Sequence, residues 1–284
     1  MYQKNSERNT RPFINTGRKI MNKKRTMWRR AAFIGCMVAA VGWLCGNAWA
    51  APLNEECAAI LKGMGSFLQE KQQFSFSIDG LQEKVKDQSE KMEVAQTASL
   101  MIKRDNKLKA VAQKDDQHRE LWYNGSTLSL LDHKAKMYAT VAAPETIDDA
   151  LDFALEELQF TMPLVDFVFN NVYENLTAEV NGSANLGEEQ VGEFTCHHLF
   201  FNQETIDWQI WIQAGETAVP RKVIIVYKEV PLKPQFKAEF SSWNFDDKLT
   251  DADFEFEPPA DAEEVEFLVD KREVAQKGGD SDEN

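Results

Sequence analysis

The most constraining feature of the sequence is a pair of apolar strands joined by a short turn. The first covers residues 207–213 (DWQIWIQ) and alternates with period two. One of its faces contains Trp208, Ile210 and Ile212. The second, residues 220–227 (PRKVIIVY), is apolar on both faces. Since such a strand must be covered on both sides, the fold has to supply a layer on each side of this pair.

Most of the other patterned segments are typical of antiparallel strands. Alternation predicts further strands over 74–78, 93–103, 107–113, 120–123, 127–131, 136–141, 176–186, 190–202 and 235–245, with a short last strand near 254–256. Asn124-Gly125 predicts a tight hairpin, and Gly187 is expected to turn the strands on either side of it. A single antiparallel sheet of this length tends to curl.

Helical patterns occur at two places in the chain. Residues 53–70 have one apolar stripe at helical spacing. Residues 146–160 begin with a capping box, Thr146 with Asp149, and the very apolar segment 162–169 follows. We therefore predict a mainly β fold with α: a curved antiparallel sheet, an unclosed half-barrel, with an N-terminal helix and a mid-chain helical lid over its concave face.

Residues 1–50 combine an N-terminal extension with the pattern of an export signal. A basic stretch that includes Arg29 and Arg30 precedes an apolar run over 31–44. Ala48-Trp49-Ala50 then matches a signal-peptidase site, so we expect cleavage after Ala50 and a periplasmic protein of the Gram-negative type. The domain is expected over 51–269, with a disordered acidic tail over 270–284.

Three alternatives remain at this end of the chain. An uncleaved anchor is one, although the apolar run is shorter than the roughly 20 residues that a span needs. A lipoprotein modified at Cys36 is another, with almost no hydrophobic segment before the cysteine. The start codon can be that of Met1 or that of Met21.

The charge of the exported part excludes several classes of partner. Residues 51–284 contain 22 Lys and Arg and 45 Asp and Glu, a net charge of −23. Nucleic acid is therefore excluded as a partner and membrane contact is at most transient, because phosphate groups require clustered basic side chains. The acidic surface suits solubility, with a cationic partner as the alternative.

Two cysteines, Cys57 and Cys196, remain after removal of the signal. In an oxidising compartment such a pair can form a disulfide, which we predict here. Two buried free thiols are the alternative. A thiol count on the denatured, unreduced protein separates the two.

No motif in the sequence indicates catalysis. There is no Gly-x-Ser-x-Gly, no glycine-rich phosphate loop and no Cys-x-x-Cys. His197 and His198 are adjacent on a predicted strand, so they point to opposite faces and cannot share a metal site. We expect His198 to be a hydrogen-bonded structural residue. The alternative is a general base, for which Asp207 is a candidate partner, although Asp207 can equally cap the strand end. We predict no catalytic residue, no cofactor and no metal.

The second half of the chain contains more apolar side chains than a small core needs. They indicate either an ordinary core or a cavity for an acyl chain, because ligand sites are concave and largely apolar. The predicted lining of that cavity is Trp208, Ile210, Ile212, Leu151, Leu155, Leu164 and Phe167.

Several motifs in chain order resemble an exported bacterial family of unknown function, domain of unknown function 2092. They are Leu121-Trp122-Tyr123-x-Gly125, Ile147-Asp148, Pro163-Leu164, Gly192-x-x-x-Cys196-x-His198-Leu199, Asp207-Trp-Gln-Ile-Trp-Ile, Pro220-Arg221-Lys222, Pro234-Gln235, Ser241-x-Trp243 and Phe254-x-Phe256-x-Pro258-Pro259. The resemblance extends over roughly residues 56–267.

That family is similar to the lipoprotein carriers LolA and LolB and to the sensor domain of RseB. The resemblance implies their curved half-barrel with a helical lid and a hydrophobic cavity. It also implies a function: a non-enzymatic periplasmic carrier for a lipid, a lipoprotein or another hydrophobic ligand. The alternative is an envelope sensor or protein-interaction module on the same fold. No binding residue is transferred, because fold analogy does not define a site.

Overall fold

The computed structural model describes residues 53–86, 89–104, 106–156 and 164–267. The predicted signal segment with its cleavage after Ala50, and the predicted tail over 270–284, lie outside these residues. None of the helices in the described ranges is long and apolar enough to cross a membrane.

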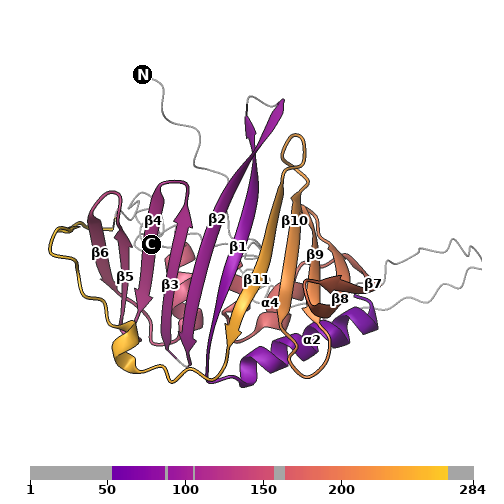
Figure 1. Cartoon of the computed structure of the whole chain (residues 1–284), viewed down its shortest axis with the longest axis horizontal. Coiled ribbons are helices and arrows are strands. Elements are labelled where there is room, and N and C mark those ends of the chain that lie inside the picture. Colours follow the sequence, from indigo (N-terminus) through magenta and orange to yellow (C-terminus); the bar gives the residue numbers. More distant parts are fainter. Residues whose placement is uncertain (1–52, 87–88, 105, 157–163, 268–284) are drawn as a thin grey trace, which may run out of the picture. The chain divides into compact units, whose positions relative to one another are not determined.

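The helices and strands follow one another along the chain as shown in Figure 1. They are α2 (Glu55–Glu70), β1 (Gln73–Lys86), β2 (Glu90–Lys103), β3 (Lys107–Lys114), β4 (Gln117–Tyr123), β5 (Thr127–Asp132), β6 (Met137–Ala142), α3 (Ile147–Glu156), the 3-10 turn η1 (Val165–Phe167), α4 (Val172–Thr177), β7 (Gly182–Val191), β8 (Phe194–Asn202), β9 (Ile206–Gln213), β10 (Pro220–Tyr227), β11 (Gln235–Asn244), the 3-10 turn η2 (Asp251–Phe254) and β12 (Glu263–Glu264).

The described strands form one unclosed sheet in the order β12-β6-β5-β4-β3-β2-β1-β11-β10-β9-β8-β7. The consecutive neighbours pair antiparallel, as in β3 with β4 and β9 with β10, whereas the short β12 runs parallel to β6. This confirms the predicted fold class, a mainly β protein with a large unclosed antiparallel sheet and few helices. Contacts divide the chain into two compact units, which are described separately; the single domain predicted over 51–269 stays a prediction.

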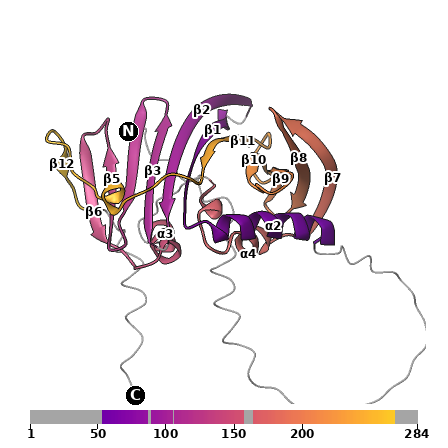
Figure 2. The same cartoon turned by 60° about the horizontal axis from the view of Figure 1, so that its bottom comes forward.

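Unit 1 contains α2, η1, α4 and the strands β7 to β10. The predicted pair 207–213 and 220–227 is β9 and β10, with Trp208 opposite Ile225 in the ladder. The backbone N–H of Asn54, just before α2, donates to the Ser183 hydroxyl of β7 at 2.8 Å. Ser183 pairs with Phe201, and Phe201 with Trp208, so these side chains share one face. Helix α2 therefore lies on the Trp208 face of these strands (Figure 2).

Unit 2 contains most of β1 and β2, the strands β3 to β6, most of β11, and α3, η2 and β12. Its apolar face is formed by alternate residues of neighbouring strands, among them Ile102 opposite Leu108 and Leu108 opposite Tyr123. Tyr123 donates to the Pro144 carbonyl at 2.5 Å, which places the start of α3 against this face. Thr146 caps α3 as predicted, since the Asp149 N–H donates to the Thr146 hydroxyl at 3.1 Å and that hydroxyl donates to Asp149 Oδ2 at 2.7 Å.

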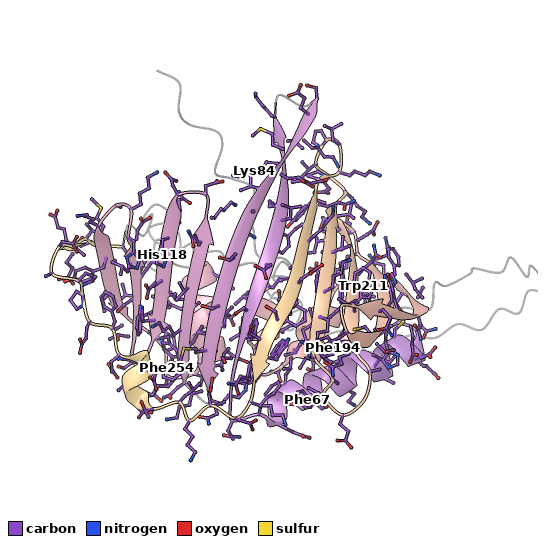
Figure 3. All side chains as sticks on the ribbon, in the orientation of Figure 1. Phe67, Lys84, His118, Phe194, Trp211 and Phe254 are labelled. Carbon is purple, nitrogen blue, oxygen red and sulfur yellow. The ribbon has the colours of Figure 1, made fainter. Side chains whose placement is uncertain are left out.

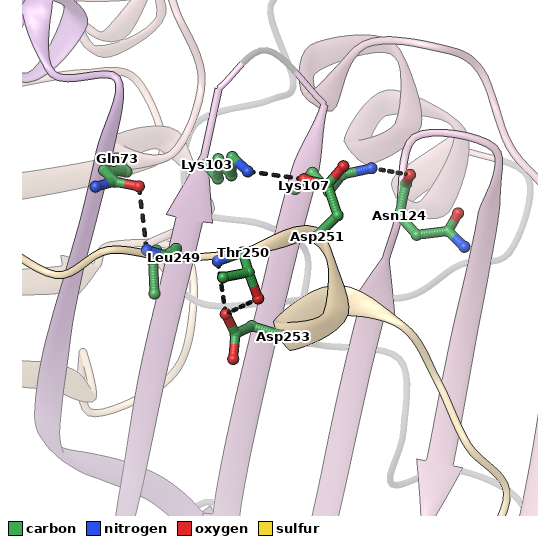
Figure 4. Close-up of polar contacts among 8 residues, drawn as sticks. All are labelled: Gln73, Lys103, Lys107, Asn124, Leu249, Thr250, Asp251 and Asp253. Atoms are coloured by element: carbon green, nitrogen blue, oxygen red, sulfur yellow. Dashed lines mark hydrogen bonds and ion pairs between the residues drawn. The ribbon is translucent and has the colours of Figure 1, made fainter.

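The chain after β11 crosses the strand ends of unit 2 (Figure 4). The Leu249 N–H donates to the Gln73 side chain at 3.3 Å, and Lys103 pairs with Asp251 at 2.7 Å. Thr250 and Asp253 cap η2 reciprocally. This turn buries Phe254 completely. The predicted strand near 254–256 is therefore wrong, because a capped 3-10 turn replaces it.

The predicted start of the strand β7, at residue 176, is also wrong. Leu176 belongs to α4 and not to a strand, because Val172 and Leu176, four residues apart, are both buried on one helical face. The hairpin between β7 and β8 turns at Gly192 (φ 58°), not at Gly187. Gly187 (φ 96°) lies instead at an irregularity of the ladder between Asn185 and Glu188, which needs the same left-handed backbone.

Candidate functional site

The seven residues predicted to line a cavity are divided between the two units. Unit 1 contains Trp208, Ile210, Ile212, Leu164 and Phe167, and unit 2 contains Leu151 and Leu155. Six of them expose at most 3% of their surface, and Leu155 is half-buried. Within the described residues they are therefore packed side chains.

The Trp208 face of unit 1 is a closed core. Trp208 stacks on Phe201 with ring centroids 4.1 Å apart. Helix α2 buries Cys57, Leu61, Met64 and Leu68. Its Gly65 comes so close to α4 that a Cβ there would lie 3.3 Å from Tyr173. This face of the sheet is occupied by the protein's own helices.

A different group of side chains in unit 2 has the properties of a binding surface. We call it the aromatic cluster: Phe74, Phe76, Phe240, Trp243 and Phe245. Trp243 is its centre, since it stacks on Phe76 at 4.4 Å and on Phe245 at 5.9 Å, with Phe74 at 6.1 Å. Phe74, Phe76 and Phe240 are at most 4% exposed, whereas Trp243 and Phe245 are partly exposed.

Local backbone geometry builds the aromatic cluster. Phe74 and Phe76 alternate on β1 and so point to the same face. On β11, Phe240 and Trp243 are three apart and would point to opposite faces of a regular strand. Ser242 adopts a positive φ of 54°, and this break in the strand brings Trp243 to the face of Phe240, with the rings 6.2 Å apart.

Two cations lie over rings of this cluster. The Lys71 ammonium is 5.5 Å from the centroid of Phe245, and the Arg104 guanidinium is 5.6 Å from that of Phe74. Both are within the range of cation–π attraction. The cluster thus combines a buried aromatic base, a partly exposed end and positive charge, in a chain whose formal net charge is −14.

The sequence indicated only part of this arrangement. Phe240 and Trp243 belong to the apolar excess in the second half, but nothing linked them to Phe74, Phe245, Lys71 or Arg104. The alternation of Phe74 and Phe76 was a usable signal. The break at Ser242 was not, because a serine in a strand gives no sign of a positive φ.

A small open cavity of about 270 Å³ lies elsewhere in unit 2. It is lined by Ser77, Ile78, Asp79, Thr97, Ala98, Ser99, Val111 and Gln113. Ser77 and Asp79 alternate with the buried Phe76 and Ile78, so the cavity is on the face opposite the aromatic cluster. Its lining mixes polar with apolar side chains.

Cys57 and Cys196, the two cysteines in the described part of the chain, are buried free thiols, and the disulfide predicted between them is not formed. Ser183 hydrogen-bonds the Cys57 side chain, and its ladder partner Phe201 is five residues from Cys196 along β8. At about 3.3 Å per residue this separates the two cysteines by about 16 Å, more than twice the Cα distance that a disulfide spans. Burial raises the pKa of both thiols, which makes them poor nucleophiles.

His198 has the structural environment that the sequence predicted, with different partners. Its Nε2 lies 2.8 Å from Gln209 Oε1 and its Nδ1 3.2 Å from Glu189 Oε2. Its ring stacks on Trp211, labelled in Figure 3, at 4.0 Å. Asp207, the partner suggested from the sequence, instead accepts from Asn202 at 2.6 Å.

The model of one protein family, "Predicted periplasmic protein (DUF2092)", matches residues 57–268, as the motifs indicated. No curated protein matches the sequence. Among the solved structures with similar folds are three at 10% identity. An uncharacterised conserved protein from Thermus thermophilus has a TM-score of 0.45, over 74% of this chain and 99% of that chain. The Mycobacterium tuberculosis lipoprotein LppX has 0.43 (69% and 100%), and a LolA superfamily protein from Nitrosomonas europaea has 0.33 (70% and 96%).

Proposed function

The chain belongs to the DUF2092 family of predicted periplasmic proteins, and from this premise we propose that it is a non-enzymatic periplasmic binding protein for a hydrophobic ligand. The ligand class is a lipid or the acyl chain of a lipoprotein. The observation that supports this function is the aromatic cluster of unit 2, which is apolar, partly exposed at Trp243 and Phe245, and flanked by Lys71 and Arg104.

Apolar burial drives this binding. Each methylene removed from water contributes about 0.8 kcal/mol, so about ten methylenes give roughly 8 kcal/mol before the cost of ordering the ligand. Partly exposed rings are suited to this role because they lose water only when the ligand arrives. The fully buried rings Phe74, Phe76 and Phe240 hold them in place.

The two cations favour one orientation of the ligand, with its head group next to them. Lys71 and Arg104 lie over the rings of a chain that is otherwise rich in carboxylates. An anionic head group next to them meets positive charge, whereas elsewhere on this surface it meets Asp and Glu. We expect a fatty acid to bind more tightly than the alcohol of the same chain length.

The seven residues predicted from the sequence stay a proposal for the lining of an acyl-chain cavity. Leu151 and Leu155 of α3 belong to the same unit as the aromatic cluster, and Leu155 is half-buried. For Trp208, Ile210, Ile212, Leu164 and Phe167 to contact a ligand, side chains that now cover them must first move.

The test is to identify what the gently purified protein retains and what it binds. Native mass spectrometry and lipid extraction give the first, and titration calorimetry with oleate or oleyl alcohol gives the second. We expect an extractable lipid and saturable oleate binding that Trp243→Ala weakens. The control is Trp211→Ala, which removes a ring from the other face of β9 in unit 1.

Two results would overturn this function. One is the absence of both extractable lipid and oleate binding. The other is a periplasmic pull-down that enriches a single protein and is insensitive to detergent, which would favour the sensor or interaction module instead.

A further inference from the structure

The hairpin of β4 and β5 brings two of the four histidines of the chain together. Arg119 pairs with Asp132 across the ladder. The next pair of positions is His118 and His133, and the His133 N–H donates to the His118 carbonyl at 3.0 Å. Side chains opposite each other in an antiparallel ladder share a face. The two imidazole rings stack with centroids 4.1 Å apart and an angle of 11°.

A carboxylate completes this group. Glu120 is two residues after His118 on β4 and therefore points to the same face. Its Oε1 is 2.7 Å from His133 Nε2 and 3.7 Å from His118 Nε2. One ligand atom from each of the three residues lies within 4.8 Å of the others. Glu120 exposes 16% of its side chain, His118 43% and His133 37%, so an ion can reach them from solvent.

We propose that His118, Glu120 and His133 form a binding site for a divalent transition-metal ion of the zinc or copper type. Two imidazoles and one carboxylate are ligands that these ions prefer, and a site with three protein ligands keeps a position for water. Calcium and magnesium do not fit, since they take oxygen ligands. The position of His118 on the sheet of unit 2 is labelled in Figure 3.

The charges around this site do not compete for the ion. The neighbouring lysines have carboxylate partners of their own: Lys134 pairs with Asp116, and Lys136 pairs with Asp261 at 2.9 Å. Arg119 and Asp132 pair with each other at 2.9 Å and alternate with the site residues, so they point to the other face.

The site is linked to the end of the described chain. His133 begins the turn between β5 and β6, and in that turn the Lys136 carbonyl accepts from the Glu263 N–H of β12 at 2.9 Å. A bound ion cross-links β4, which contains His118 and Glu120, to the start of this turn at His133. It therefore stabilises the folded protein by mass action, and the unfolding midpoint rises with the ion concentration.

The test uses the mature protein with Zn²⁺ in titration calorimetry and with Cu²⁺ in electron paramagnetic resonance. We expect one ion per chain and a copper spectrum that shows coupling to two nitrogens. His118→Asn and His133→Asn each remove one nitrogen from the spectrum. Each weakens Zn²⁺ binding by at least about 100-fold, because losing a ligand costs at least as much affinity as losing a residue that only orients a ligand. Glu120→Gln weakens binding without changing the nitrogen count.

The matched control is His197→Asn, which removes a histidine of β8 that has a single carboxylate near it, Glu188 at 3.7 Å. It leaves both readouts unchanged. Circular dichroism establishes that each variant is folded, and the nitrogen count is read only from folded protein. The proposal is overturned if the wild type binds no Zn²⁺ stoichiometrically, or if His118→Asn and His133→Asn bind as tightly as the control.

Discussion

Two tryptophans, one in each unit, show how similar apolar sequence patterns lead to different surfaces. Trp208 of unit 1 is 1% exposed, stacks on Phe201 and lies on the face that α2 covers. Trp243 of unit 2 is partly exposed and has four phenylalanine rings within 6.2 Å. The first is a core residue and the second is the centre of a surface that a ligand can complete. What separates them is the covering helix, which alternation within a strand does not reveal.

The largest expected effect is that of Trp208→Ala. Removing a fully buried indole leaves a cavity that α2 and β9 cannot fill, so we expect the free energy of unfolding to fall by about 3–5 kcal/mol. Urea unfolding followed by circular dichroism measures it. If the variant loses less than about 1 kcal/mol, the Trp208 face is not a core and the contrast with Trp243 is wrong.

The second effect compares one tyrosine of each unit, the buried Tyr123 and the half-buried Tyr227. Burial, together with the nearby Asp149 and Glu145, raises the pKa of Tyr123 to about 12, and burial alone raises that of Tyr227 to about 12. Because the pKa is raised in the folded state, the stabilisation is complete below the unfolded pKa of about 10 and is lost as the pH rises from there to about 12. Each tyrosine contributes at most about 2.7 kcal/mol to this loss.

Variants separate the two tyrosines. Tyr123→Phe and Tyr227→Phe each remove one tyrosinate from the ultraviolet titration and flatten the alkaline loss of stability. Asp149→Asn lowers the pKa of Tyr123 and leaves that of Tyr227 unchanged, since only Tyr123 has this carboxylate near it. Equal responses of the two tyrosines to Asp149→Asn would contradict this assignment.

A smaller loss of stability is expected for Trp243→Ala, with a larger loss of binding. Because the indole is already partly exposed, its removal costs about 1–2 kcal/mol, mostly in ring contacts. The affinity for oleate falls by at least about tenfold, which corresponds to about 1.4 kcal/mol. The ratio of the two losses distinguishes the units: Trp208→Ala affects mainly folding and Trp243→Ala mainly binding. Unchanged oleate affinity in a folded Trp243→Ala variant would argue against the aromatic cluster as the site.

The parts of the fold that were predictable are those that local patterns determine. The pairing of 207–213 with 220–227 follows from alternation around a short turn, and α2 follows from its apolar stripe. The start of β7 was not predictable in this way, because residues 176–181 contain both helix-compatible and strand-compatible side chains. Burial of Leu176 in the core of unit 1 favours the helical conformation of this segment.

The candidate sites depended on register, which local patterns leave open. A two-residue turn at Asn124-Gly125 would place His133 opposite Asp116. The observed pairing of Tyr123 with Leu128 shifts the hairpin by two residues and places His133 next to His118. A change of two preserves every face, so the hydrophobic pattern could not distinguish the two registers. The prediction that no metal is bound rested on the His197 and His198 pair and did not consider this hairpin.

The smallest expected effect is that of a reductant on the stability of the protein, which we expect to stay unchanged. Cys57 and Cys196 both belong to unit 1, yet the register of β7 and β8 holds them about 16 Å apart at opposite ends of β8. A thiol count on the denatured, unreduced mature protein should therefore give two thiols, and dithiothreitol should leave the urea midpoint unchanged. A count of zero, with a midpoint that falls on reduction, would mean that the start of α2 packs at the other end of β8 and on its other face, since Cys196 is five residues from Phe201. In that case α2 would not cover Phe201 and Trp208 as described, and the core in unit 1 would have to be redrawn together with its contrast to Trp243.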